Sequence, residues 1–330
     1  MANLLNTKVS VFSSTNQGRA QNTKEIGRII GAIFIIKGSS FTAASTATQA
    51  LFQAALVALS QNNNKYLRSY SVGNFADFKE NDAADQTAKV PYGGSRSIAR
   101  GIPSFSTMLL NGGMDEYQNL VKLHNKHTMF DMLLIDESNT IYGSVNAAGL
   151  LCGISLGQLW VPKWDLPTSS DYAKYMLTIQ LARTSDIVEN LRYFDVGVDV
   201  LALTQPFTDI QLVGVDSGVK GVFTMSITAG YSNEDLTNYF ATPLATSTNW
   251  LASVTTSGSS IVVTSATVTA GTPGFQGSVA LALVTTTPYP SAPDKVTITL
   301  AAPSVLTTNG LVKSDGGFEC TSPAFVIVTE

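Results

Sequence analysis

Hydrophobic and polar residues alternate along several stretches of this chain, and the alternation predicts a protein built mainly from β-strands. Within residues 172–181, apolar side chains occupy every second position from Tyr175 to Leu181, and the opposite face carries Lys174, Thr178 and Gln180. A period of two is typical of a strand that buries one face and exposes the other. The same alternation recurs within residues 219–228, where we expect another strand of this kind.

The stretch 114–181 carries the strongest of these signals, and we expect it to form the centre of the fold. Residues 115–127 predict a helix that begins with acidic residues and ends with basic ones, an order that suits the helix dipole. Residues 129–142 read as two strands joined by a polar turn, which predicts a β-hairpin. The strand 172–181 would join the same sheet.

Four further segments precede this centre. Residues 26–37 are rich in isoleucine and predict a strand covered on both faces. Residues 45–60, dominated by Ala, Leu and Gln, predict a helix. Residues 73–101 lack periodicity and predict a long loop, and residues 1–24 predict a flexible arm; both would order against partners. The helix face expected to pack on a neighbour carries Leu51, Ala54, Ala58 and Leu59.

Further strands are expected over 65–72 and 103–110, before the centre, and over 196–203 and 210–215, after it.

The composition changes after Asp235, because no charged residue occurs again until Asp294. Short runs of Thr, Val and Ser recur in this part, separated by turns with Gly and Pro, which is the pattern of a small β-sandwich. We place the domain boundary near residue 245. Residues 25–245 then form a β domain with the helices near 45–60 and 115–127, and residues 246–330 form the sandwich.

The low charge of the chain suggests that partner subunits cover much of its surface. Charged residues make up 13% of the sequence, against about 25% in an ordinary soluble domain. The net charge is −4 and no cluster of Lys and Arg stands out, which argues against a nucleic-acid-binding face. Two distant cysteines, Cys152 and Cys320, form neither a disulfide framework nor a metal-binding spacing. We expect Cys152, within an apolar run, to be a buried free thiol.

The first residues lack the charged start and long apolar core of a signal peptide. The most apolar run, residues 29–36, is far shorter than the ~20 residues of a membrane-spanning helix. We therefore expect a soluble protein made in the cytoplasm, with no membrane insertion.

One catalytic motif matches the chain. Residues 153–157 fit G-x-S-x-G, which places Ser155 as a nucleophile, but in that fold the catalytic histidine follows the serine. The two histidines, His124 and His127, both precede it, and no set of cysteines or carboxylates beside them completes a metal site. We therefore predict that the protein is not an enzyme and has no catalytic, cofactor-binding or metal-binding residues and no cofactor.

The order of elements from Tyr92 to Asp195 resembles the tail-tube fold of tailed bacteriophages. A Gly-rich loop follows Tyr92, and a strand, a helix, a hairpin and a further strand come after it. Residues 136–143 read Asp-x-x-Asn-x-Ile-x-Gly, a run common at this place in that family. The resemblance implies a mainly β (α+β) fold, with a tail-tube-like β-sandwich or barrel and a packed helix. Residues 246–330 resemble the immunoglobulin-like β-sandwich modules often appended to phage structural proteins.

The resemblance also implies a function. The helix at 45–60 and the appended domain depart from a plain tube subunit and favour a ring of fixed copy number, similar to tail ring or head–tail proteins of short-tailed, crAss-like phages. Such a subunit is a structural virion protein, made in the host cytoplasm, that forms a ring or tube segment of a phage tail or head–tail connector.

The partners expected of such a subunit are its own copies in a homo-oligomeric ring and other tail or connector proteins. DNA would pass through the lumen without specific binding, and a mildly acidic wall would let it slide. The alternatives are a capsid or capsid-decoration protein, a virion adhesin or carbohydrate-binding protein, and an enzyme.

Overall fold

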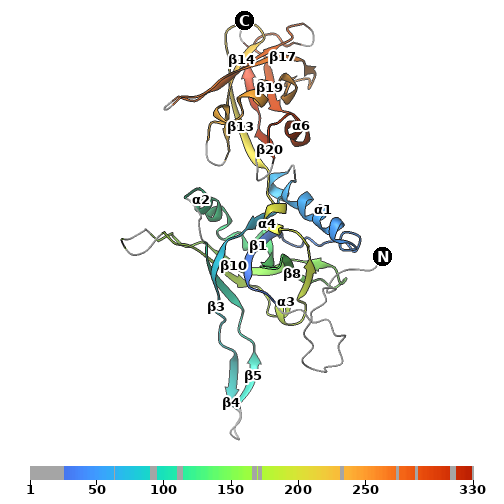
Figure 1. The fold of residues 1–330 in the computed structure, drawn as a ribbon, viewed down its shortest axis with the longest axis vertical. Coiled ribbons are helices and arrows are strands. Elements are labelled where there is room, and N and C mark those ends of the chain that lie inside the picture. Colours follow the sequence, from blue (N-terminus) through green and yellow to red (C-terminus); the bar gives the residue numbers. More distant parts are fainter. Residues whose placement is uncertain are drawn as a thin grey trace. The chain divides into compact units, whose positions relative to one another are not determined.

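The computed structural model describes residues 26–62, 64–89, 95–109, 114–165, 169, 173–230, 234–272, 275–286, 289–312 and 317–328. Strands make up 45% and helices 17% of the structure, so the fold is mainly β, as the alternation predicted. The chain divides into two compact units, Met1–Gln205 and Pro206–Glu330 (Figure 1). The flexible N-terminal segment expected over residues 1–24 lies outside the described residues.

A large sheet and its covering helices make up the first unit. Its strands are β1 (Ile29–Ile36), β2 (Tyr70–Val72), β3 (Phe75–Glu80), β4 (Gln86–Lys89), β5 (Ser95–Ala99), β6 (Ser104–Leu109), β7 (Phe130–Asp136), β8 (Thr140–Val145), β9 (Leu151–Cys152), β10 (Ile154–Trp160), β11 (Tyr175–Leu181) and β12 (Arg192–Asp195). Its helices are α1 (Gln49–Ser60), α2 (Met114–Leu123), α3 (Ser185–Val188) and α4 (Val200–Leu203), with 3-10 turns η1 (Lys65–Leu67) and η2 (Lys126–Thr128).

Strand β7 is the centre of the large sheet, which contains all of these strands except β4 and β5 and is ten-stranded. Strands β4 and β5 pair with each other in a separate two-stranded sheet. Along one edge it pairs over its whole length with β1. Along the other edge it pairs first with β10, at Asp131 and Met132, and then with β8, at Leu134 and Ile135. The sheet therefore branches at β7, with β8 leading to β12 and β10 leading through β11 and β6 to β3.

Both faces of β1 and β7 are buried. On one face, Ile33 and Ile35 pack with Leu133 and with Phe52 of α1. On the other face, Phe34 and Met132 belong to a second cluster that includes side chains of β6, β10, β11 and α2. This double burial explains why β1 and β7 read as continuous apolar runs, whereas β11, with one buried face, alternates along its whole length.

Two sheets that enclose one core make up the second unit. Its strands are β13 (Thr208–Asp216), β14 (Val222–Ala229), β15 (Trp250–Val254), β16 (Ser260–Ile261), β17 (Val263–Thr269), β18 (Ser278–Leu283), β19 (Lys295–Leu300), β20 (Phe318–Ser322) and β21 (Ala324–Ile327). Its helical elements are α5 (Ala241–Leu244), α6 (Pro303–Thr308), η3 (Leu236–Asn238) and η4 (Ser247–Asn249). The sheets have the strand orders β17-β18-β14-β13-β20 and β16-β15-β19-β21, so the unit is a two-layer β-sandwich.

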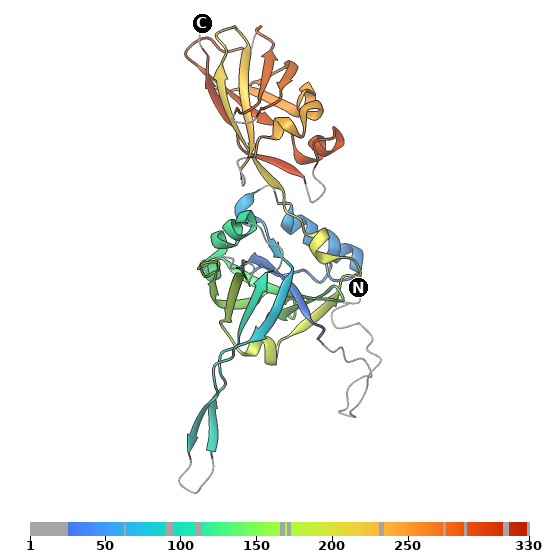
Figure 2. The same ribbon diagram turned by 60° about the vertical axis from the view of Figure 1, so that its left-hand side comes forward.

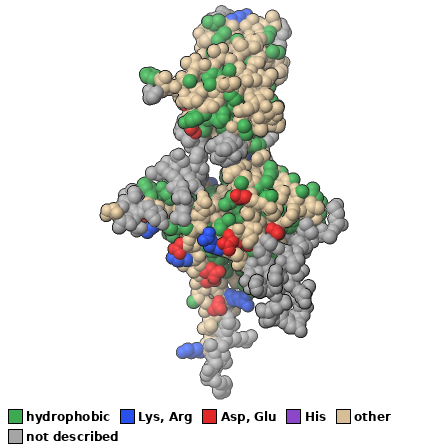
Figure 3. Space-filling view, in the orientation of Figure 1, with side chains coloured by type: hydrophobic (Ala, Val, Ile, Leu, Met, Phe, Trp, Pro, Cys, Tyr) green, Lys and Arg blue, Asp and Glu red, His purple; other side chains and the backbone are tan. Residues whose placement is uncertain are grey.

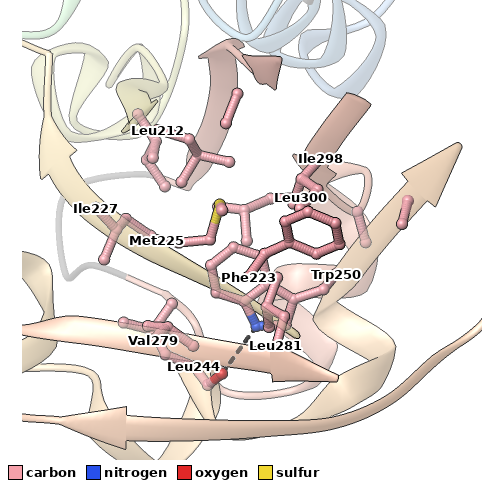
Figure 4. Packing of buried hydrophobic residues seen from close by; sticks show 14 of the residues in the cluster. Leu212, Phe223, Met225, Ile227, Leu244, Trp250, Val279, Leu281, Ile298 and Leu300 are labelled. Carbon is pink, nitrogen blue, oxygen red and sulfur yellow. Dashed lines mark hydrogen bonds between the residues drawn. The ribbon is translucent and has the colours of Figure 1, made fainter. Parts of the chain in front are cut away.

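Figure 4 shows the core between these sheets. Phe223 and Met225 of β14 are fully buried and face Trp250 and Ile298 of the opposite sheet (Figure 4). The indole nitrogen of Trp250 donates a hydrogen bond to the backbone oxygen of Leu244 at 2.8 Å, which satisfies the one polar atom of this side chain.

The two units divide between Gln205 and Pro206, whereas we expected a boundary near residue 245. The hairpin β13–β14 belongs to the second unit, because β14 pairs with β18 and β13 pairs in parallel with β20. Both partners lie beyond residue 245. The expected domains 25–245 and 246–330 would cut through one hydrogen-bonded sheet.

Several elements differ from their expected form. Residues 73–101 are not one long loop but contain β3, β4 and β5. The strand expected over 196–203 is replaced at its end by α4, because the side chain of Asp199 accepts hydrogen bonds from the backbone of Leu201 and Ala202 and caps a helix. Of the strand expected over 65–72, only β2 is extended.

The two long helices are shorter than expected. Helix α1 begins at Gln49 because the Thr48 hydroxyl accepts the backbone hydrogen bond of Leu51 at 3.2 Å. Helix α2 ends at Leu123, and Asn125 follows with a left-handed φ of 58°. Among the described residues, no helix is long and apolar enough to cross a membrane.

Candidate functional surfaces

The turn at residues 136–143, which carries the resemblance, is built around a fully buried carboxylate. Asp136 Oδ1 accepts hydrogen bonds from the backbone nitrogens of Ser138 and Thr140, each at 2.9 Å. The Tyr142 hydroxyl donates to Asp136 Oδ2 at 2.8 Å. Burial, and next this hydrogen bond, raise the pKa of Tyr142 far above its ordinary value, so its hydroxyl remains a donor. Asp136 therefore holds the β7–β8 hairpin together.

The other residues of this motif are structural as well. Asn139 has a left-handed φ of 57°, which asparagine tolerates, and its Oδ1 accepts the backbone hydrogen bond of Val200 at 3.2 Å. A Cβ atom at Gly143 would lie 2.5 Å from the carbonyl oxygen of Cys152, so only glycine fits there. The motif describes a turn and a close strand contact, and it contains no reactive group.

Ser155 does not sit on a nucleophile elbow. It lies on β10, and its backbone nitrogen donates to Asp186 Oδ2 at 3.0 Å. Gly153 and Gly157 flank it because added Cβ atoms would lie 2.5 Å from Asp131 Cβ and 2.8 Å from the Leu181 carbonyl oxygen. The G-x-S-x-G match thus reflects close strand packing, and a serine-hydrolase site is not built here.

The structure also locates the two histidines. Nδ1 of His124 accepts the backbone hydrogen bond of Val161 at 3.1 Å, which fastens the segment after α2 to the end of β10. His127 lies in η2, and the Lys37 ammonium donates to its backbone oxygen at 3.3 Å. Among the described residues, no group of three or more His, Cys, Asp or Glu side chains could hold a metal ion.

A buried carboxyl lies near Cys152. Asp131 is 4% exposed, and its Oδ2 accepts the backbone hydrogen bond of Gly38 at 2.8 Å, while its Oδ1 has no hydrogen-bond partner. Burial raises the pKa of Asp131. Cys152 is a free thiol, but it is half-buried and not fully buried as we expected. Burial, and then the nearby charges of Asp131 and Asp186, raise its pKa to about 11. A thiol this hard to ionise is a poor nucleophile.

An aromatic segment follows β10, and only one of its two tryptophans packs as an anchor. Trp164 stacks on Tyr175 with ring centroids 6.1 Å apart, and the Tyr117 hydroxyl donates to the Pro162 carbonyl oxygen at 3.1 Å. Trp160 is 49% exposed. Residues 166–168 and 170–172 lie outside the described residues.

Charge is distributed unequally along the chain. Residues 206–330 contain three lysines and no arginine against eight acidic residues, so the second unit has a net charge of −5. The first unit is nearly neutral and carries most of the charged residues, which gather on it in Figure 3. The face of the second unit in that view is largely polar and apolar without charge.

One side of the β-sandwich presents an apolar strand edge, which we call the β13/β21 edge. Strand β20 pairs with β13 only as far as Gln211, so no strand pairs with residues 212–215 of β13 on that side among the described residues. Strand β21 ends the other sheet, where it pairs only with β19 in the described part of the chain. The two strands meet at Gly214, where an added Cβ would lie 2.6 Å from a methyl carbon of Val326. The exposed side chains along this edge are Val213, Val215, Phe325 and Ile327, each at least half exposed.

Helix α1 presents a second uncharged surface. Its buried residues are Phe52, Leu56 and Ser60. Of the face expected to pack on a neighbour, Leu51 (46% exposed), Ala54 and Ala58 are open within this chain, whereas Leu59 packs against the core cluster of Phe52 and Leu56. The helix contains no charged residue, so this open face is apolar.

No protein-family model matches this chain, and its comparison with curated proteins finds no significant match.

Proposed function

We propose that this protein is a structural subunit of a phage virion, and that its copies form a ring or tube segment of a tail or head–tail connector. In this proposal the first unit is tail-tube-like and the second is an immunoglobulin-like sandwich. The subunit acts by its shape: copies join side by side, other tail or connector proteins stack on the ring, and DNA passes through the centre.

The β13/β21 edge is the observation that carries the proposal. Soluble monomers blunt their strand edges with charged residues, prolines or covering loops, since bare edges pair with other chains. Strand β21 has no charged residue, and its exposed Phe325 and Ile327 are large and apolar. An edge of this composition is suited to constant cover by another subunit.

Two further observations support an assembling subunit over an enzyme. The open face of α1 is apolar, like the buried core of an interface. Ser155 lies within strand β10, the His124 side chain accepts a backbone hydrogen bond, and the pKa of Cys152 is raised. A protein that works by geometry needs no reactive group.

Electron microscopy and sedimentation velocity of the purified protein over a range of concentrations test the proposal. We expect rings of defined rotational order that dissociate on dilution. The double variant Phe325→Lys/Ile327→Lys should assemble at least tenfold more weakly, because two charges on an edge strand oppose pairing. Thr267→Lys/Thr269→Lys adds the same charge to exposed positions of β17 and is the matched control.

A wild-type protein that stays monomeric at every concentration would contradict the proposal. Equal weakening by both double variants would show that added charge alone, and not the β13/β21 edge, controls assembly.

The proposed passage of DNA has its own test. We propose that the wall of the lumen is weakly acidic, in keeping with the net charge of −4, so that DNA slides past it. A ring reconstruction with a wall rich in Lys and Arg, or tight binding of a short DNA duplex at physiological salt, would contradict this.

A further inference from the structure

Residues 77–89 and 95–104 form a projection of the first unit that we call the arm. It comprises the end of β3, the hairpin β4–β5 and the start of β6, with β4 and β5 paired antiparallel from Gln86↔Ala99 to Lys89↔Ser95. Figures 1 and 2 both show this hairpin extending away from the large sheet. All residues from 79 to 89 are exposed. A two-stranded ribbon is marginally stable by itself, so a partner that covers it would stabilise it.

The charges of the arm are sorted by sign. Its root, residues 77–85, contains four acidic residues and one lysine, a net charge of −3. Its outer part, residues 86–100, contains three basic residues and no acidic one, a net charge of +3. The acidic residues are Asp77, Glu80, Asp82 and Asp85, and the basic residues of the outer part are Lys89, Arg96 and Arg100.

The root is held in a defined geometry. Asp82 Oδ1 accepts the backbone hydrogen bond of Ser104 at 3.0 Å, and Asp85 Oδ1 accepts that of Gly101 at 2.7 Å. At Gly101 the outgoing and returning segments of the arm approach so closely that an added Cβ would lie 1.5 Å from the Ala83 carbonyl oxygen. The carboxylates of Asp82 and Asp85 are thus held by backbone hydrogen bonds, and that of Asp77 is ion-paired with Lys79, while all of these side chains remain exposed.

We propose that the outer part of the arm of one copy binds the root of the arm of another copy. Charges that only kept an exposed ribbon soluble would not need to be separated by sign. Separation makes the arm complementary to itself, and complementary charges fix the register of an interface. The partner is a second copy of this chain because a polyanion lying along the arm would be repelled by the four root carboxylates. The inference rests on the proposed self-assembly and names a contact within it.

Charge exchange between root and outer part tests this contact. The outer variant carries Lys89→Glu, Arg96→Glu and Arg100→Glu. The root variant carries Asp77→Asn, Glu80→Lys, Asp82→Asn and Asp85→Asn, where Asn keeps an oxygen that accepts the hydrogen bonds of Ser104 and Gly101. Each variant alone places like charges together at the contact, so we expect its assembly at low salt to weaken at least tenfold.

The decisive measurement is an equimolar mixture of the two variants. In the mixture each altered surface meets an opposite charge on the other variant, so we expect assembly to recover, and a single chain with all seven substitutions should recover as well. Assembly of the wild type should weaken as salt increases, because exposed charges are screened.

The possible outcomes separate the two proposals. Wild-type rings with variants that assemble equally well would overturn the arm contact and leave the ring intact. Loss in each variant without recovery in the mixture would also overturn it, because the loss would then be damage to the fold. Loss of DNA-duplex binding by the outer variant, with assembly unchanged, would assign a polyanion as the partner. A wild type that never assembles would overturn both proposals.

Discussion

The buried Asp136 carboxylate offers the sharpest test of how the central hairpin is held together. It is fully buried and accepts two backbone hydrogen bonds and one from the Tyr142 hydroxyl. Replacement by Ala removes all three bonds and leaves buried donors without an acceptor. Replacement of Tyr142 by Phe removes the third, together with the hydrogen bond that the backbone of Gly27 donates to the Tyr142 hydroxyl.

The expected magnitudes follow from these bonds. A hydrogen bond to a buried charged group contributes about 1.5–3 kcal/mol to stability. We therefore expect Tyr142→Phe to lower the free energy of unfolding of the first unit by about 2 kcal/mol. Asp136→Ala should lower it by about 4 kcal/mol, since the bonds share one group and do not add fully. The double variant should cost little more than Asp136→Ala.

Hydrogen exchange read by mass spectrometry is the suitable assay, because it reports the two units of the intact chain separately. A loss of about 4 kcal/mol corresponds to roughly thousandfold faster exchange of β7 and β8 amides, and a loss of about 2 kcal/mol to roughly thirtyfold. Peptides of the second unit serve as the internal reference. Glu137→Ala removes a neighbouring carboxylate that is 56% exposed and 3.9 Å from Arg28, and it should change exchange little.

Exchange in Asp136→Ala within threefold of the wild type would refute this account of the hairpin. The turn would then be held by the burial of β7 and β8 alone, and the Asp-x-x-Asn-x-Ile-x-Gly run would have no structural role at its first position.

Three further predictions concern ionisable groups. Burial raises the folded-state pKa of Asp131, so its contribution to stability is full below the unfolded pKa of 3.8 and is lost as pH rises through the folded-state pKa. Asp131→Asn should remove this decrease in stability, measured by urea unfolding across pH. For Asp235, burial raises the pKa, but hydrogen bonds from Thr237 and Gly277 outweigh burial and lower it. Its contribution to stability is therefore present above the unfolded pKa of 3.8 and is lost as pH falls through the folded-state pKa. Asp235→Asn should abolish this loss of stability. The Cys152 pKa of about 11, against an ordinary 9.0, should make alkylation by iodoacetamide at pH 8 about a hundredfold slower in the folded protein than in urea, and equal rates would contradict its burial.

Alternation and turn chemistry predicted much of the central sheet. Strand β11 buries Tyr175, Leu177, Ile179 and Leu181 as its sequence pattern indicates, and β1 is covered on both faces as its isoleucine run indicates. The hairpin of β7 and β8 was predicted from the polar turn between them. These features depend on neighbours in the sequence, so a local pattern records them.

The candidate surfaces were less accessible to such reasoning. The open face of α1 was expected to pack on a neighbour, but the sequence pattern did not show that Phe52 and Leu56 form its buried face. The β13/β21 edge was not predicted at all, because exposure of Phe325 depends on which strands lie beside it. The sorted charges of the arm were visible in the sequence, yet residues 73–101 were interpreted as a loop because a solvent-exposed ribbon shows no burial period.

The sequence by itself determined the period of each long strand and the turn around Asp136, because each depends on side chains within a few residues of one another. The caps at Thr48 and Asp199 are equally local, but we expected a helix from residue 45 and a strand over 196–203, so the structure revealed them. Only the tertiary structure decided where the chain divides into units. Thr208 pairs with Phe318 and Val222 with Ala282, so the assignment of β13 and β14 depends on strands that occur much later in the chain. Strand pairing is a competition between distant segments for the same hydrogen bonds and core, and a one-dimensional pattern does not record which of them succeeds.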